Sequence, residues 1–91
     1  MSLPVVPLGR GTVIIGDEVI EYRALSRSEA LRLNTYRGRE DEAEVYIIQC
    51  GTGCTEDEAK AFRDGNDAPT AGLLIDGIIE ISGLMGNSPK T

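Results

Sequence analysis

Glycines that end short segments are the feature of this sequence that most constrains its fold. The dipeptide Gly16-Asp17 is a turn signal, and further stops are expected at Gly38, Gly51-Thr52-Gly53, Gly65 and Gly83. The segments between these stops allow only short helices and strands. A short hairpin or helix is marginal in water unless it packs against another element, so we predict several short elements around one core.

The first two segments predict a β-hairpin. Residues 12–15 are a β-branched run, and residues 19–25 continue in β-forming residues after the turn. Side chains alternate between the two faces of a strand, so Ile20, Tyr22 and Ala24 share one face, which we expect to point to the core.

Two helices are predicted after the hairpin. The first begins at about Arg27, because Ser26 and Glu29 match a capping box, in which each side chain accepts a hydrogen bond from the other residue's backbone. Negative charge is favoured at a helix N-terminus, so the acidic residues from Glu40 onward suit the start of the second helix. That helix is apolar over much of its circumference, which places it at the centre of the core or between subunits.

Two further helices are predicted in the C-terminal half. Thr55 and Glu58 match a second capping box, which predicts a third helix of about two turns. Pro69 suits the first turn of a fourth helix, whose apolar residues form one broad stripe before Gly83.

Together these elements predict a single α+β domain over residues 11–84, an N-terminal β-hairpin followed by three to four short α-helices. Residues 1–10 contain two prolines and no periodic pattern, so they are expected to form a flexible arm, and residues 85–91 a flexible tail. A chain of 91 residues buries roughly 60–65% of the surface that its unfolded form exposes, so we expect association to help stabilise it.

Composition argues against several classes of function. The chain has no His and no Trp, and its 15 acidic against 9 basic residues give a net charge of −6. Without His it lacks the usual general base near neutral pH and the commonest metal ligand, so we expect no catalysis, no metal and no other cofactor. An acidic chain with one Phe is a poor candidate for binding nucleic acid. No apolar run of 18 residues and no signal peptide is present, so we expect no membrane association and a cytoplasmic protein.

Three local patterns are interpreted as structural. The glycine-rich segment 51–55 lacks the lysine of a phosphate-binding loop, and the acids from Glu40 to Glu44 lack the spacing of a calcium-binding loop. Cys50 and Cys54 are expected to be free thiols, Cys50 as a small buried residue and Cys54 as a loop residue. The alternative is a disulfide that closes one short loop between them.

The net charge conceals two adjacent blocks of opposite sign. Residues 22–39 hold five arginines and one acid, for +4, and residues 40–58 hold seven acids and no base, for −7. Such blocks attract one another within a monomer, or head to tail between copies in a homo-oligomer. We predict that self-association or partner binding uses these blocks and the apolar stripe of the last helix. The residues concerned are Arg23, Arg27, Arg32, Arg37, Arg39, Glu40, Asp41, Glu42, Glu44, Leu74, Ile78 and Ile81. If the monomer core buries the whole apolar stripe, partner binding must instead use the hairpin edge or the arginine block.

Three segments carry a resemblance to a known family. They are residues 22–33 (YRALSRSEALRL), 51–59 (GTGCTEDEA) and 74–84 (LIDGIIEISGL). In the order of these segments and in their residue patterns, the chain resembles tail assembly chaperones of long-tailed bacteriophages, in particular those of phages that infect actinobacteria.

The resemblance implies a protein made in the host cytoplasm and absent from the finished virion. Such a chaperone binds the tape-measure protein, keeps its hydrophobic helices from aggregating and helps to recruit tail-tube subunits. The resemblance also implies that ribosomal frameshifting near the end of the reading frame yields a longer form. Ser88-Pro89-Lys90 is compatible with a slippery heptamer of the kind this requires.

Other functions remain open at this stage. The first alternative is a small structural phage protein, such as a head-to-tail connector or tail-completion subunit. A regulatory module that binds nucleic acid through the arginines, and an enzyme, are less well supported because of the net charge and the absence of His.

Overall fold

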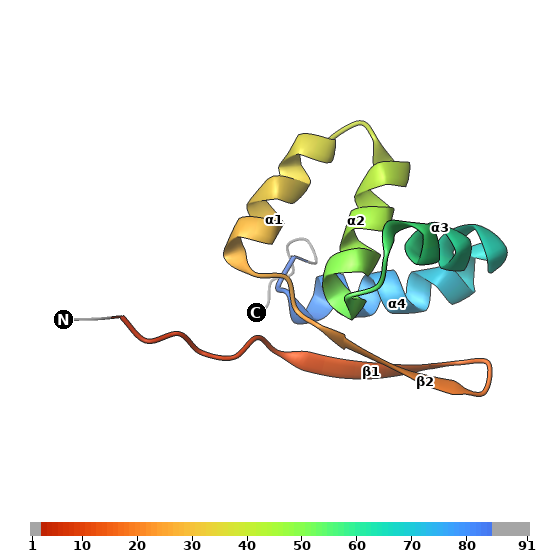
Figure 1. The fold of residues 1–91 in the computed structure, drawn as a ribbon, viewed down its shortest axis with the longest axis horizontal. Helices are drawn as coiled ribbons and strands as arrows, with labels where there is room; N and C mark the ends of the chain where they lie inside the picture. Colours follow the sequence, from red (N-terminus) through yellow and green to blue (C-terminus); the bar gives the residue numbers. More distant parts are fainter. Residues whose placement is uncertain (1–2, 85–91) are drawn as a thin grey trace, which may run out of the picture.

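A computed structural model describes residues 3–84 of the chain (Figure 1). The predicted tail, residues 85–91, lies outside the described residues. The elements in chain order are β1 (Arg10–Ile15), β2 (Glu18–Arg23), α1 (Arg27–Leu33), a 3-10 turn (Asn34–Tyr36), α2 (Glu40–Thr52), α3 (Glu56–Gly65) and α4 (Ala68–Ile81). This arrangement confirms the predicted α+β fold, with an N-terminal hairpin followed by four α-helices.

The hairpin forms as the sequence predicts. Its strands are antiparallel, with Arg10 opposite Arg23 at the open end and Ile15 opposite Glu18 beside the turn. Gly16 in the turn has φ +63°, a left-handed conformation that favours glycine. The face expected to point to the core does so, since Ile20 is half-buried and Ala24 is buried. This face packs on α4 and α2, and Figure 1 shows the hairpin running beneath the helices.

Both predicted capping boxes are present. The Ser26 hydroxyl accepts from the Glu29 N–H at 3.2 Å, and Glu29 Oε1 accepts from the Ser26 N–H at 2.9 Å. Thr55 and Glu58 make the same pair of bonds at 3.1 and 2.9 Å. The helix that follows Thr55 has ten residues, about three turns, and so is longer than predicted.

Helix α2 lies at the centre of the core, as its apolar circumference predicts. It supplies Val45, Ile47 and Ile48, and these pack with Leu25, with Ala59 of α3 and with Leu74, Ile75 and Ile78 of α4. Gly51 lets α2 approach α4 closely, because a Cβ at this position would lie 2.7 Å from Ile78 Cγ1. The helix ends at Gly53, whose φ of +79° breaks it.

The N-terminal arm, residues 3–9, projects from the open end of the hairpin (Figure 1). Strand β1 starts at Arg10, so the arm ends one residue earlier than predicted. The Gly9 carbonyl accepts a hydrogen bond from the Ala24 N–H at 2.7 Å, which fixes the base of the arm. Beyond this point the arm's side chains face solvent, and Val5 is 95% exposed.

No helix within residues 3–84 combines the length and the apolar character needed to cross a bilayer.

Candidate functional site

The apolar stripe of α4 is used by the core of the monomer. Leu74 is 2% exposed and Ile78 is fully buried, whereas Ile81 is half-buried. Leu74 and Ile78 were predicted as association residues, but in this fold they offer almost no surface to a partner. Periodicity identified the apolar face of the helix correctly, and α2 and the hairpin of the same chain cover it. A partner could contact only the surfaces that the core leaves free.

Arg23 is tied to the start of α1. Its Nη1 donates to Glu29 Oε1 at 2.8 Å and its Nη2 to Glu29 Oε2 at 2.9 Å. Hydrogen bonds from Arg23, together with those from Ser26, lower the pKa of Glu29 to about 2. Glu29 thus caps α1 and also joins it to β2, so this arginine belongs to the scaffold.

The other four arginines of the block differ in their surroundings. Arg39 Nη1 binds Glu42 Oε1 at 2.8 Å, and its guanidinium lies 5.1 Å from the centre of the Tyr36 ring. Arg27, Arg32 and Arg37 are exposed and form no ion pair within residues 3–84. These three give α1 and the turn after it a positive surface.

The acidic block pairs mainly with a residue outside the arginine block. Arg63 of α3 binds Asp41 at 2.8 Å, Glu44 at 3.0 Å and Asp64 at 3.1 Å, while Glu40 forms no ion pair within the described part of the chain. Only Arg39 and Glu42 join the two blocks directly. Arg63 was not predicted as a site residue, because its partner Asp41 lies 22 residues away and no pattern of neighbouring residues links the two.

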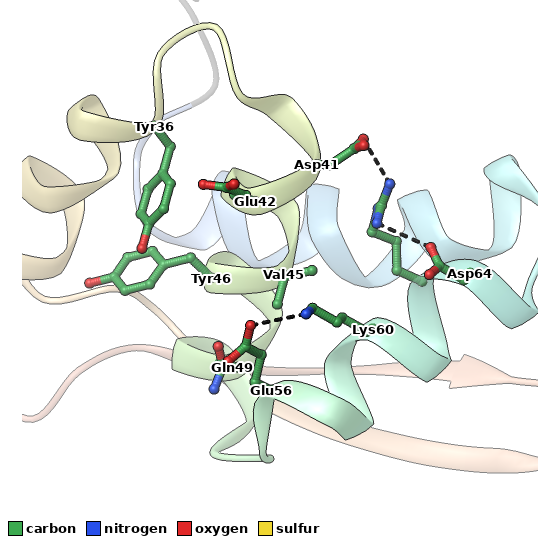
Figure 2. A pocket seen from close by; sticks show the side chains of 10 residues that line it. Tyr36, Asp41, Glu42, Val45, Tyr46, Gln49, Glu56, Lys60 and Asp64 are labelled. Atoms are coloured by element: carbon green, nitrogen blue, oxygen red, sulfur yellow. Dashed lines mark hydrogen bonds and ion pairs between the residues drawn. The ribbon is translucent and has the colours of Figure 1, made fainter.

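A cleft of about 370 Å³, the tyrosine cleft, lies between α2, α3 and the 3-10 turn (Figure 2). Tyr36 from the turn and Tyr46 from α2 form one side, with ring centres 5.3 Å apart and planes tilted by 34°. Val45 also lines the cleft. Burial, followed by a hydrogen bond with Cys50, raises the pKa of Tyr46 to about 12.

Gln49 and six charged residues line the rest of the tyrosine cleft. The charged residues are Asp41, Glu42, Glu56, Lys60, Arg63 and Asp64. Lys60 pairs with Glu56 at 3.2 Å, whereas Arg63 is shared by three carboxylates. The cluster around Arg63 therefore keeps a net negative charge, and Figure 2 shows two of its carboxylates, Asp41 and Asp64, on the side of the cleft opposite the tyrosines. The sequence predicted α2 only as a largely apolar helix and gave no role to Tyr46, so the cleft was not predicted.

The hairpin presents a second candidate surface. Ile14 and Val19 are opposite each other in the strand register and are 66% and 64% exposed. Thr12 and Glu21 form the next exposed pair on this side. We call these four residues the hairpin face. The core cluster includes neither Ile14 nor Val19.

The two cysteines are free and half-buried. Cys50 was predicted to be buried, but it lies at the edge of α2 where part of its surface remains exposed. Burial nevertheless raises the pKa of its thiol, which disfavours the reactive thiolate.

Comparison of the chain with protein-family models, with curated proteins and with solved structures finds no significant match.

Proposed function

We propose that this protein is a bacteriophage tail assembly chaperone, a binding protein without catalytic activity that works in the host cytoplasm and is absent from the mature virion. Its client would be the tape-measure protein, and it would assist the recruitment of tail-tube subunits. A longer, frameshifted form would also be made. The resemblance in residues 22–33, 51–59 and 74–84 motivates the proposal. The observation that carries it is the exposed hairpin face, an apolar surface that the core does not need.

The hairpin face suits a weak and reversible contact with an apolar client. Complete burial of an Ile or Val side chain contributes about 1.5–3 kcal/mol. Ile14 and Val19 are each about two-thirds exposed, so covering both contributes about 2–4 kcal/mol. That corresponds to binding in the millimolar range or weaker for one copy. A long client with many apolar segments would bind several copies, and their combined contacts would keep it soluble while still allowing release.

Two further features support a role in binding. Within residues 3–84 the sheet has two strands, so each strand has an outer edge whose backbone groups are available to an extended partner. The exposed Arg27, Arg32 and Arg37 add a positive surface that would bind acidic side chains of the client.

Co-expression with the protein encoded directly downstream, if that is a very long helical chain, tests the proposal. We expect the wild-type protein to increase the soluble fraction of this client and to purify with it. The double variant Ile14→Thr/Val19→Thr keeps β-branched residues in the strands but loses apolar surface, so it should do neither. Leu73→Gln is the matched control, because Leu73 is 53% exposed but lies on α4 outside the hairpin face.

Two outcomes would contradict the proposal. The first is a client that stays insoluble while the wild-type protein purifies alone. The second is the detection of abundant peptides of this protein in purified virions by mass spectrometry, which would favour a head-to-tail connector or tail-completion subunit.

A further inference from the structure

We infer that the N-terminal arm of one copy binds in the tyrosine cleft of a second copy. This inference concerns self-association and does not depend on the proposed client. It joins two features of the chain that the monomer leaves unused, an extended apolar segment and a cleft with aromatic and acidic sides.

The arm has the chemistry of a polyproline II ligand. Pro4 and Pro7 are three residues apart, and a polyproline II helix has three residues per turn, so both prolines lie on one face of such a helix. Leu3, Val5 and Val6 are all at least 75% exposed. Proline fixes φ, so ordering this segment on a partner costs less conformational entropy than ordering an unrestricted chain.

The tyrosine cleft has the chemistry of a receptor for such a segment. Domains that bind polyproline II segments hold them in grooves lined by aromatic side chains. Tyr36 and Tyr46 are both half-buried, so part of each ring is available in the cleft.

The charges of the two partners are complementary. The arm, residues 3–9, contains no charged side chain, and the first is Arg10, three residues after Pro7. Arg10 is the first residue of β1, and three residues of extended chain span at most about 10–11 Å, so its Cα lies within that distance of the Pro7 Cα. Asp41 and Asp64 pair with Arg63 on the side of the cleft opposite the tyrosines, and this net negative group would attract Arg10 of the bound copy (Figure 2).

The position of the arm favours a second copy over the arm's own cleft. The hydrogen bond between Gly9 and Ala24 holds the base of the arm, and Figure 1 shows the arm running away from α2 and α3, which form the cleft. Each copy can then bind two others, one through its arm and one through its tyrosine cleft. Such head-to-tail contacts build chains, or rings when the geometry closes.

Sedimentation velocity of the full chain over a range of concentrations tests this inference. We expect the wild-type protein to associate as its concentration rises, and less so at high salt. Pro4→Gly/Pro7→Gly alters only the arm, and Tyr36→Ser alters only the cleft. Each should weaken self-association about tenfold or more. Leu73→Gln, which changes an exposed apolar residue of α4, should leave association unchanged. Circular dichroism shows whether each variant is folded.

Mixing the arm variant with the cleft variant gives the decisive result. The arm variant retains an intact cleft and the cleft variant retains an intact arm, so an equimolar mixture should form heterodimers that grow no further. A wild-type protein that stays monomeric at every concentration would overturn the inference. So would association that persists in the arm variant, or association that the arm variant loses but Tyr36→Ser keeps.

Discussion

Replacing Gly51 with Ala tests how closely α2 and α4 pack. A Cβ at this position would lie 2.7 Å from Ile78 Cγ1 and 3.2 Å from Ile78 Cγ2. Nonbonded carbon atoms prefer separations of about 3.5–4.0 Å, and Ile78 is fully buried, so its side chain has little room to move. Overpacking of this kind costs about 1–3 kcal/mol, and the gain in helix propensity returns up to about 1 kcal/mol. We expect Gly51→Ala to lower the free energy of unfolding by about 1–2 kcal/mol and the melting temperature by about 5–10 °C.

Urea unfolding followed by circular dichroism measures this effect, at one fixed protein concentration because self-association changes apparent stability. Gly72→Ala on α4 is the control, since the nearest atom to its added Cβ is Asp76 Oδ2 at 3.8 Å, an ordinary contact. It should stabilise the fold by about 0.5–1 kcal/mol. Ile78→Val removes the Cδ1 methyl near the added Cβ, so the pair with Gly51→Ala should cost about 1 kcal/mol less than the sum of the single changes. Strict additivity, or a Gly51→Ala variant as stable as Gly72→Ala, would refute the close packing of the two helices.

Three further predictions concern the cap of α1, the frameshift and the virion. The pKa of Glu29 is lowered from its ordinary value of 4.5 to about 2, so its contribution to the stability of the fold is complete above pH 4.5 and is lost as the pH falls towards 2. Glu29→Gln should therefore be about 1–2 kcal/mol less stable than wild type at pH 7. Urea unfolding should show that this difference in stability becomes smaller below pH 4.5. A difference that stays constant down to pH 2 would argue against an ionised Glu29 paired with Arg23. The codons of Ser88-Pro89-Lys90 should contain a slippery heptamer, and synonymous changes that break it should remove the longer product from an immunoblot. Mass spectrometry of purified virions should detect few or no peptides of this protein, whereas abundant peptides would indicate a structural component.

Local signals in the sequence were sufficient to predict the elements. The capping boxes at Ser26 and Thr55 involve residues three positions apart, so the sequence alone specifies both partners. The alternation in β2 likewise determines which side of the hairpin faces the core.

Contacts between distant segments were not predictable in the same way. Periodicity marks Leu74 and Ile78 as apolar, but an apolar face looks the same in sequence whether its own chain or a partner covers it. The ion pair between Arg63 and Asp41 depends on how α2 packs against α3. The contact between the Tyr36 and Tyr46 rings depends on how α2 packs against the 3-10 turn. The candidate sites therefore had to come from the structure, although their residue types are visible in the sequence.

The hydrogen bond from the Leu25 N–H to Ser82 Oγ, at 2.8 Å, has a consequence for the order in which the protein folds during synthesis. It joins residues 57 positions apart, and α4, which packs on both strands, is the last helix within residues 3–84. A two-stranded hairpin is marginal without a covering element, so the packing of β1 is complete only after α4 has left the ribosome. Contacts over such long sequence separations also slow folding. Until α4 has been translated, α2 is the helix that can cover part of the hairpin, and strand β1 lacks its main packing partner.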